Sequence, residues 1–236
     1  MTAMNVAAVS VATAVCGVVV GIVSLSGTAL LMGNSIIALA KDNLFIVLFL
    51  TMLLSIVMGM GMPTSAVYIV CATFAAPVIT RMGIPILVSH MFVFYFGCMA
   101  SITPPVAVAS IVAAGIAGAS VNKTGFLAFR LAIAGFIVPY FFVYTPALIG
   151  DYSIWSTIIA TVICLLALIS LGASMEGYFF TNIQPTLRWI LGLGAVLLVL
   201  PGMPTNVIGL IIVMVIVVLN FSKSKKEKNV VRCTKV

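Results

Sequence analysis

Long apolar runs separated by short polar breaks dominate the chain. The run Leu44–Met58 is followed by the helix-breaking stretch Gly59–Thr64, and a second apolar run, Ser65–Thr80, continues to the charge at Arg81. As helices these runs would be about 22 and 24 Å long, shorter than the roughly 30 Å hydrocarbon core of a bilayer. Irregular backbone is tolerated at membrane depth only where protein or a water-filled cavity covers it. We therefore predict a re-entrant helical hairpin whose tip is 59–64.

A second interrupted element follows the hairpin. The segment Ile84–Ala119 is apolar on both sides of Thr103-Pro104-Pro105. Two successive prolines remove two backbone N–H donors and push Thr103 away from helical angles. We therefore predict a single discontinuous transmembrane helix that breaks at Thr103-Pro104-Pro105 and resumes from Val106 to Ala119, with a new helix N-terminus after Thr103.

The remaining pattern predicts an all-α integral membrane protein. Thr124 is expected to cap a helix that runs from Gly125 to about Ile149, and Tyr152–Leu171 is expected to cross the membrane again. The motif Gly-Met-Pro-Thr occurs at 61–64 and again at 202–205. The second copy is either a coincidence in a chain rich in these residues or the tip of another hairpin, and two short spans would serve equally. The predicted division of the chain is 1–43 (a first transmembrane helix, Val6 to about Ser26, and a connecting arm, Thr28–Ala40), 44–120 (hairpin and broken helix), 121–171 (two transmembrane helices), 172–221 (C-terminal loop and apolar helix pair) and 222–236 (basic tail).

Composition supports a membrane location. Apolar residues make up 64% and charged residues 6% of the 236 residues, against roughly 45–50% and 25% in soluble domains. With this topology two Lys or Arg residues, Lys41 and Arg81, lie on one side, and the other nine, six of them in the tail, lie on the opposite side. The positive-inside rule then makes the tail cytoplasmic. Because the basic residues sit beside a membrane segment without interleaved aromatics, nucleic-acid binding is disfavoured.

The two interrupted elements together suggest a ligand site. Two helix N-termini at one level favour a carboxylate or another anion, whereas exposed carbonyls and the hydroxyls of Thr64, Ser65, Ser101 and Thr103 suit a small hard cation. Between Leu44 and Val121 the sequence has no Asp, Glu or Lys, although a proton relay normally uses a titratable carboxylate in the membrane. Sodium is therefore the expected ion, and no cofactor is expected.

Other reactive residues give weaker signals. The five cysteines have no metal-like spacing, and His90 is the only histidine, so an enzyme is disfavoured for want of an acid/base pair. His90 lies about 20 Å along the helix from Thr103, which favours a packing or interfacial role over proton transfer. Arg130 is expected to extend to the membrane surface, with substrate clamping as the alternative.

Several motifs in order resemble one known family. They are Gly59-Met-Gly-Met-Pro-Thr-Ser-Ala-Val-Tyr, His90-Met-Phe-Val-Phe-Tyr-Phe-Gly, Ile102-Thr-Pro-Pro-Val-Ala, Ala114-Gly-Ile-Ala-Gly-Ala and Lys123-Thr-Gly-Phe with Phe136-Ile-Val-Pro. Over about 5–150 the chain resembles the large (DctM-like) membrane subunit of tripartite ATP-independent periplasmic (TRAP) transporters, especially the fused-permease type. The resemblance implies sodium-driven symport of an organic acid across the bacterial inner membrane by an elevator mechanism. It places the ion and substrate positions at Gly59, Gly61, Pro63, Thr64, Ser65, Ser101, Thr103, Pro104 and Pro105.

The resemblance also predicts partners. The family's large subunit contains two inverted halves, and this chain corresponds to the second, so a first half, a small membrane subunit and a periplasmic substrate-binding protein are the expected partners. Two alternatives remain at this point. The chain could be a non-transporting fragment or assembly partner, or the broken helices could line a channel.

Overall fold

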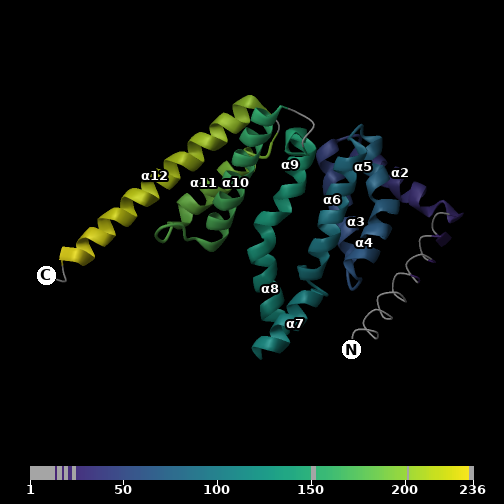
Figure 1. The fold of residues 1–236 in the computed structure, drawn as a ribbon, viewed down its shortest axis with the longest axis horizontal. Helices are drawn as coiled ribbons and strands as arrows, with labels where there is room; N and C mark the ends of the chain where they lie inside the picture. The colour runs from purple at the N-terminus through teal and green to yellow at the C-terminus, as the bar shows by residue number, and fades with distance from the viewer. Residues whose placement is uncertain are drawn as a thin grey trace. The chain divides into compact units, whose positions relative to one another are not determined.

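The computed structural model describes residues 14, 18, 21, 22, 25–149, 153–200 and 202–233, and these residues are helical or connect helices (Figure 1). Within them one isolated antiparallel bridge joins Tyr178 and Asn182, and no strand is formed. The chain divides into two compact units, Met1–Phe129 and Arg130–Val236. The first expected span, Val6 to Ser26, lies mostly outside the described residues.

Unit 1 holds the hairpin and the broken helix. Asn43 starts the hairpin because its Oδ1 accepts hydrogen bonds from the backbone N–H groups of Phe45 (3.0 Å) and Ile46 (3.4 Å). At the same end of the unit, Arg81 donates to Asn34 Oδ1 at 2.7 Å. The elements are α2 (Thr28–Ala40), α3 (Leu44–Gly59), α4 (Thr64–Phe74), α5 (Ala76–Arg81), α6 (Ile86–Met99), the 3-10 turn η1 (Ala100–Ile102), α7 (Val108–Ala117) and α8 (Val121–Ala132), whose last residues belong to unit 2.

Two glycines allow the helices of unit 1 to approach closely. A Cβ on Gly97 of α6 would lie 2.5 Å from Val67 Cγ1 of α4, and one on Gly59 of α3 would lie 2.8 Å from both Gly97 O and Ala100 Cβ. Val67 and Ala100 are buried, with exposed fractions of 2% and 1%. The three helices therefore pack closely next to the hairpin tip, with the backbone of α3 against that of α6 and the Val67 side chain of α4 against Gly97.

The second arm of the hairpin differs from the prediction in two ways. It is split at Ala75 into α4 and α5, because Pro77 lacks the N–H group that would continue the helical ladder. Together the pieces form an 18-residue apolar segment, Thr64–Arg81, long enough to cross a membrane. The expectation that both arms are too short is therefore wrong for the second arm, while α3 remains short.

The discontinuous helix is interrupted where the prolines predict, but the break is longer. Helix α7 begins at Val108 and not at the expected Val106, and Ala107 before it has a left-handed φ of 40°. The two prolines provide no N–H donors, so the backbone cannot resume a ladder at once. Helix α8 also begins earlier than expected, at Val121. Thr124 is not its cap, because its hydroxyl donates to Ser120 O at 3.0 Å in the manner of a residue inside a helix.

Unit 2 is built around three long helices. Its elements after α8 are η2 (Ile133–Ile137), α9 (Val138–Tyr144), η3 (Pro146–Ile149), α10 (Ile154–Glu176), α11 (Pro185–Leu197) and α12 (Met203–Cys233). A Cβ on Gly209 of α12 would lie 2.9 Å from Gly194 O of α11, so these two helices also pack closely. Ser174 Oγ of α10 donates to Arg188 O at 2.7 Å, which joins α10 to α11.

Three boundaries in unit 2 differ from the expected ones. The helix predicted from Gly125 to Ile149 is divided, because the segment tightens into η2 before Pro139 and stops before Pro146. Helix α10 continues past Leu171 to Glu176 and ends where Gly177 adopts a φ of 74°. Helix α12 passes through the expected start of the tail at 222 and ends at Cys233, since charged residues with good helix propensity continue it.

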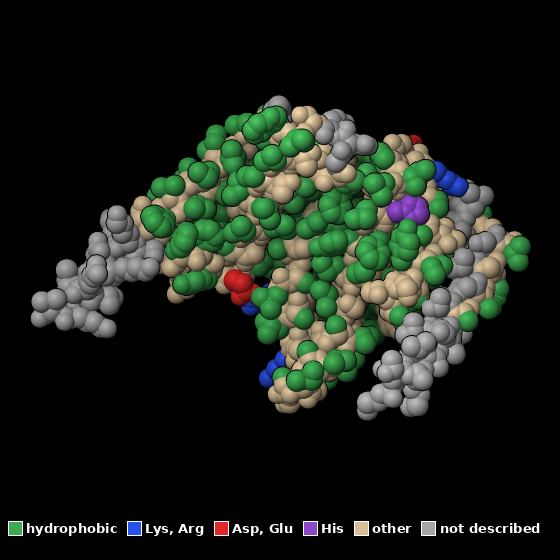
Figure 2. All heavy atoms as spheres, in the orientation of Figure 1, with side chains coloured by type: hydrophobic (Ala, Val, Ile, Leu, Met, Phe, Trp, Pro, Cys, Tyr) green, Lys and Arg blue, Asp and Glu red, His purple; other side chains and the backbone are tan. Residues whose placement is uncertain are grey.

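The described helices identify a multi-pass membrane protein. Four segments are long and apolar enough to cross a bilayer: Thr64–Arg81, Val121–Tyr144, Ile154–Glu176 and Pro204–Ser222. The face seen in Figure 2 is covered largely by hydrophobic side chains. Such exposure suits a lipid environment and not water. The second Gly-Met-Pro-Thr copy starts α12, which is long enough to span, whereas its partner α11 has 13 residues.

Replacing Gly97 by Ala tests the close approach of α4 and α6. The new methyl group would lie 2.5 Å from the buried, β-branched Val67, so we expect Gly97→Ala to destabilise the protein by about 1–3 kcal/mol. Thermal unfolding in detergent measures the change. The control is Gly115→Ala on α7, where nothing lies within 4 Å of the new Cβ. Equal stability of the two variants would contradict the packing described.

Removing the Asn43 cap tests the start of the hairpin. Asn43→Ala leaves the N–H groups of Phe45 and Ile46 without their side-chain acceptor and should cost about 1 kcal/mol. Asn43→Asp keeps an acceptor at the same position and should retain most of the stability in the same unfolding assay. A loss as large in Asn43→Asp as in Asn43→Ala would refute the capping role.

Candidate functional site

The hairpin tip exposes the start of α4. Gly61 takes a left-handed φ of 77°, and Pro63 has the extended backbone that precedes the helix. The first helical bond of α4 runs from Val67 N to Pro63 O at 3.0 Å, so the N–H groups of the three residues before Val67 have no partner within the helix. Thr64 and Ser65 are solvent-exposed in unit 1. The tip therefore presents backbone donors, two hydroxyls and the positive end of a helix dipole.

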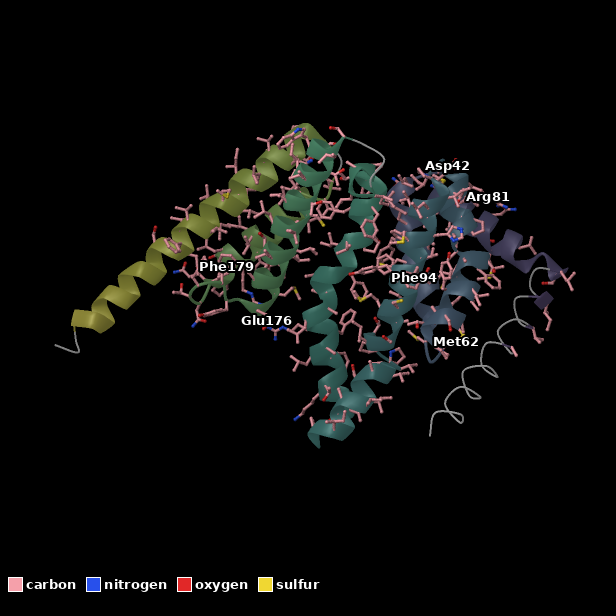
Figure 3. All side chains as sticks on the ribbon, in the orientation of Figure 1. Asp42, Met62, Arg81, Phe94, Glu176 and Phe179 are labelled. Atoms are coloured by element: carbon pink, nitrogen blue, oxygen red, sulfur yellow. The ribbon has the colours of Figure 1, made fainter. Side chains whose placement is uncertain are left out.

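The tip lies far from the polar base of the hairpin. Figure 3 shows Met62 at one end of α3 and α4, and Asp42 and Arg81 at the other end of unit 1. The tip is thus separated from the charged residues by the length of the apolar helices. This separation is what a neutral-oxygen site inside an apolar layer requires.

The broken helix supplies further oxygens. Ser101 Oγ donates to Cys98 O at 2.8 Å, and Thr103 Oγ1 donates to Met99 O at 2.8 Å. Each hydroxyl uses its proton in this bond and keeps lone pairs that can face a cation. The peptide bond between Pro104 and Pro105 is cis. Thr103 is 9% exposed, so its hydroxyl is largely shielded.

The contact at Gly59 brings the two interruptions together. Gly59 ends α3, and it packs against Gly97 and Ala100, where α6 gives way to η1. The next residues along each segment are the tip on one side and Ser101 and Thr103 on the other. Of the predicted residues, Gly59 is thus placed directly against the broken helix.

A groove lies beside the break. It has a volume of about 440 Å³. Its lining includes two of the nine predicted site residues, Pro104 and Pro105, and none of the hairpin residues. Gly125 brings α8 close to the loop, because its Cβ would lie 3.8 Å from Ala107 Cβ. The groove is lined by Pro104, Pro105, Val106, Ala107, Val121, Asn122, Gly125 and Phe126.

Two polar residues near this groove were missed by the sequence reasoning. Asn122 contributes an amide to its wall, and Ser110 on α7 is buried, with a hydroxyl that has no hydrogen-bond partner in the described part of unit 1. The position of Asn122 facing a break 17 residues earlier arises from the packing of α8, which no local pattern encodes.

His90 pairs with a tyrosine of the hairpin. Its Nδ1 lies 3.1 Å from Tyr68 OH, and the Tyr68 ring also packs edge-on against Phe94, with centroids 5.5 Å apart. The pair joins α4 to α6, as the packing interpretation of His90 predicts. Among the described residues no group of three or more His, Cys, Asp or Glu side chains is placed to hold a metal ion.

Arg130 bonds to residues at the C-terminal end of α10 in unit 2. Its Nη2 donates to Met175 O at 3.0 Å and lies 3.4 Å from Glu176 Oε2. Both side chains are exposed, so the pair lies at the surface of the unit. This pairing disfavours the alternative in which Arg130 clamps substrate.

The apolar helices define a multi-pass membrane protein. A family model described as "Tripartite ATP-independent periplasmic transporter, DctM component" matches residues 1–156. The chain belongs to this family, whose members are transporter permeases and not enzymes. Membership implies partnership with a periplasmic binding protein and a small membrane subunit. Comparisons with curated proteins and with solved structures gave no match.

The Tyr68–His90 bond can be tested by a double-mutant cycle. Tyr68→Phe keeps the ring contact with Phe94 and removes the hydroxyl, so it should lower stability by about 1 kcal/mol. His90→Gln removes the imidazole, and the double variant should cost less than the sum of the single ones. Additive losses in detergent unfolding would show that the two side chains are not coupled.

Proposed function

We propose that the chain is the permease component of a sodium-coupled transporter that takes up an organic acid. The single observation that carries this proposal is the packing of Gly59 against Gly97 and Ala100. It joins the end of α3 to the segment where α6 is interrupted, so unpaired helix ends from two elements come close together. This pairing of discontinuous helices is the arrangement that secondary transporters use for substrate and coupling ion.

The available oxygens favour sodium. Thr64, Ser65, Ser101 and Thr103 offer hydroxyl lone pairs, and the ends of α3 and η1 offer backbone carbonyls. All of these ligands are neutral, and the sequence between Leu44 and Val121 has no carboxylate. A small hard cation can be held by such oxygens without a proton-carrying group.

The start of α4 favours a carboxylate substrate. The unused N–H groups before Val67 and the dipole of α4 together form a positive end at the tip. Gly61 and Pro63 shape the backbone there, and Gly61 leaves space because nothing lies within 4 Å of its Cβ position. An organic acid would thus bind through its carboxylate to the tip, while Pro104 and Pro105 line a separate groove beside the break.

The proposal includes a topology and partners. The hairpin would be re-entrant, and it would move with the broken helix as the second inverted repeat of an elevator-type transporter in the bacterial inner membrane. A periplasmic binding protein would deliver the substrate. A first inverted half and a small membrane subunit would complete the permease, and the basic C-terminal end would face the cytoplasm.

Alanine substitution of two threonines tests the ion site. Thr64→Ala and Thr103→Ala each remove one hydroxyl ligand, and each should raise the half-saturating sodium concentration by about fivefold, the factor for a contact of about 1 kcal/mol. Sodium-dependent uptake is measured in proteoliposomes that contain the assembled transporter and its binding protein.

Thr73→Ala is the matched control. Thr73 lies on α4, but its hydroxyl bonds to Ile69 O of the same helix at 2.9 Å, away from the tip. The sodium dependence of uptake by the Thr73→Ala variant should therefore equal that of wild type. Unchanged sodium affinity in both Thr64→Ala and Thr103→Ala would reject the site. If single-channel current were recorded in place of saturable coupled flux, the protein would be a channel and the transporter proposal would be rejected.

A further inference from the structure

Several helix ends and polar residues lie together at one end of unit 2. Helix α10 ends there at Glu176, α11 begins at Pro185, and the apolar part of α12 ends at Ser222, directly before Lys223. The three ends meet, because Arg188 Nε donates to Ser174 O at 2.6 Å and Asn220 Oδ1 accepts from Phe180 N at 3.1 Å. A level at which apolar helices end and charged residues begin is a membrane–water interface.

The loop between α10 and α11 is aromatic. Tyr178 and Phe180 are 57% and 45% exposed, and Phe221 of α12 is 55% exposed. The Phe180 ring packs edge-on against Phe179 and Phe221, with centroid distances of 4.6 and 5.4 Å. Aromatic side chains concentrate at the headgroup level of bilayers. Figure 3 labels Phe179 and Glu176 at this end of the unit.

Asn220 holds this loop in place. Its Oδ1 accepts from the N–H groups of Phe180 (3.1 Å) and Thr181 (3.2 Å), and its Nδ2 donates to Thr181 O (3.5 Å). Asn220 is 8% exposed. The loop is therefore fixed to α12 by an amide at the depth where the apolar helix ends.

A small cavity opens beside Asn220. Its volume is about 200 Å³, which is below the roughly 300–1,000 Å³ of sites that enclose a drug-sized ligand. Three carboxamide residues and four aliphatic residues line it. Its lining is Asn182, Gln184 and Asn220 with Ile183, Leu187, Ile216 and Leu219.

We propose that this cavity binds the glycerol-phosphate region of an anionic phospholipid. The carboxamide N–H groups would donate to phosphate and ester oxygens, and the acyl chains would leave the cavity along Leu219, which is 53% exposed. The cationic Arg188 and the basic sequence after Ser222 favour a negative headgroup. A volume this small fits part of a lipid whose chains lie outside it.

The lipid site is independent of transport. It lies beyond residue 156, where the family match ends, and needs only the chain's location in a membrane. We infer a lipid as the ligand from three features found at the same place: the amphipathic lining of the cavity, the aromatic loop beside it and the position at the end of the apolar helices.

Native mass spectrometry of the purified full chain in detergent tests the proposal. Phosphatidylglycerol and phosphatidylcholine with identical acyl chains are titrated separately, and wild type should retain phosphatidylglycerol preferentially. Gln184→Leu removes one carboxamide from the wall and should lower that retention by about fivefold, as expected for one hydrogen bond. The Gln184 side chain makes no capping bond to α11, so this variant should fold.

A pair of tryptophan variants provides the steric test. Leu219→Trp fills the cavity and should abolish preferential retention of phosphatidylglycerol. Val218→Trp adds the same side chain at a neighbouring position of α12 that is 56% exposed and outside the lining, and it should bind as wild type does. Equal retention of the two lipids by wild type, or wild-type retention in Leu219→Trp, would overturn the proposal.

Discussion

In a hydrocarbon layer every backbone N–H and C=O group must be paired or covered, and in unit 1 the helical pairing stops after α3 and again after η1. Helix α3 ends at Gly59 and α4 begins at Thr64, so several groups between them cannot bond within a helix. The absence of a side chain at Gly59 and Gly97 lets α6 cover this end at backbone distance. The interruptions are thus kept next to each other by packing.

The positions of the interruptions could be predicted from sequence, because glycine and proline act on their own residues and immediate neighbours. The lengths of the helices between the interruptions could not be predicted in this way. Helix α7 starts at Val108 because Ala107 adopts a left-handed conformation, which nothing in its side chain predicts. Thr124 has the residue type of a cap, yet α8 extends past it to Val121. Tertiary packing decides such boundaries, and local propensity does not.

In the candidate site, too, some features could be predicted from local sequence and others depend on tertiary packing. Residue type alone suggested the hydroxyls of Ser101 and Thr103 as ion ligands. In the structure each hydroxyl donates a hydrogen bond to a backbone carbonyl one turn earlier. That bond uses the hydroxyl proton, so toward any further partner the oxygen can act only as an acceptor. The groove beside the prolines depends instead on α8, whose Gly125 approaches Ala107 and places Asn122 in the wall. A pattern of single residues cannot reveal a wall contributed by another helix.

In unit 2 the backbone carbonyls at the end of α10 are paired with charged side chains. The Met175 carbonyl at the end of α10 accepts from Arg130 and from Arg188, so two cations meet the negative end of one helix dipole. Gly177 lies so close to Arg188 that a Cβ there would be 2.9 Å from Nη1. Side chains thus cap this end with charge, whereas in unit 1 the end of α3 is covered by α6 because Gly59 and Gly97 carry no side chain. The same backbone requirement is met by arginines in one unit and by glycines in the other.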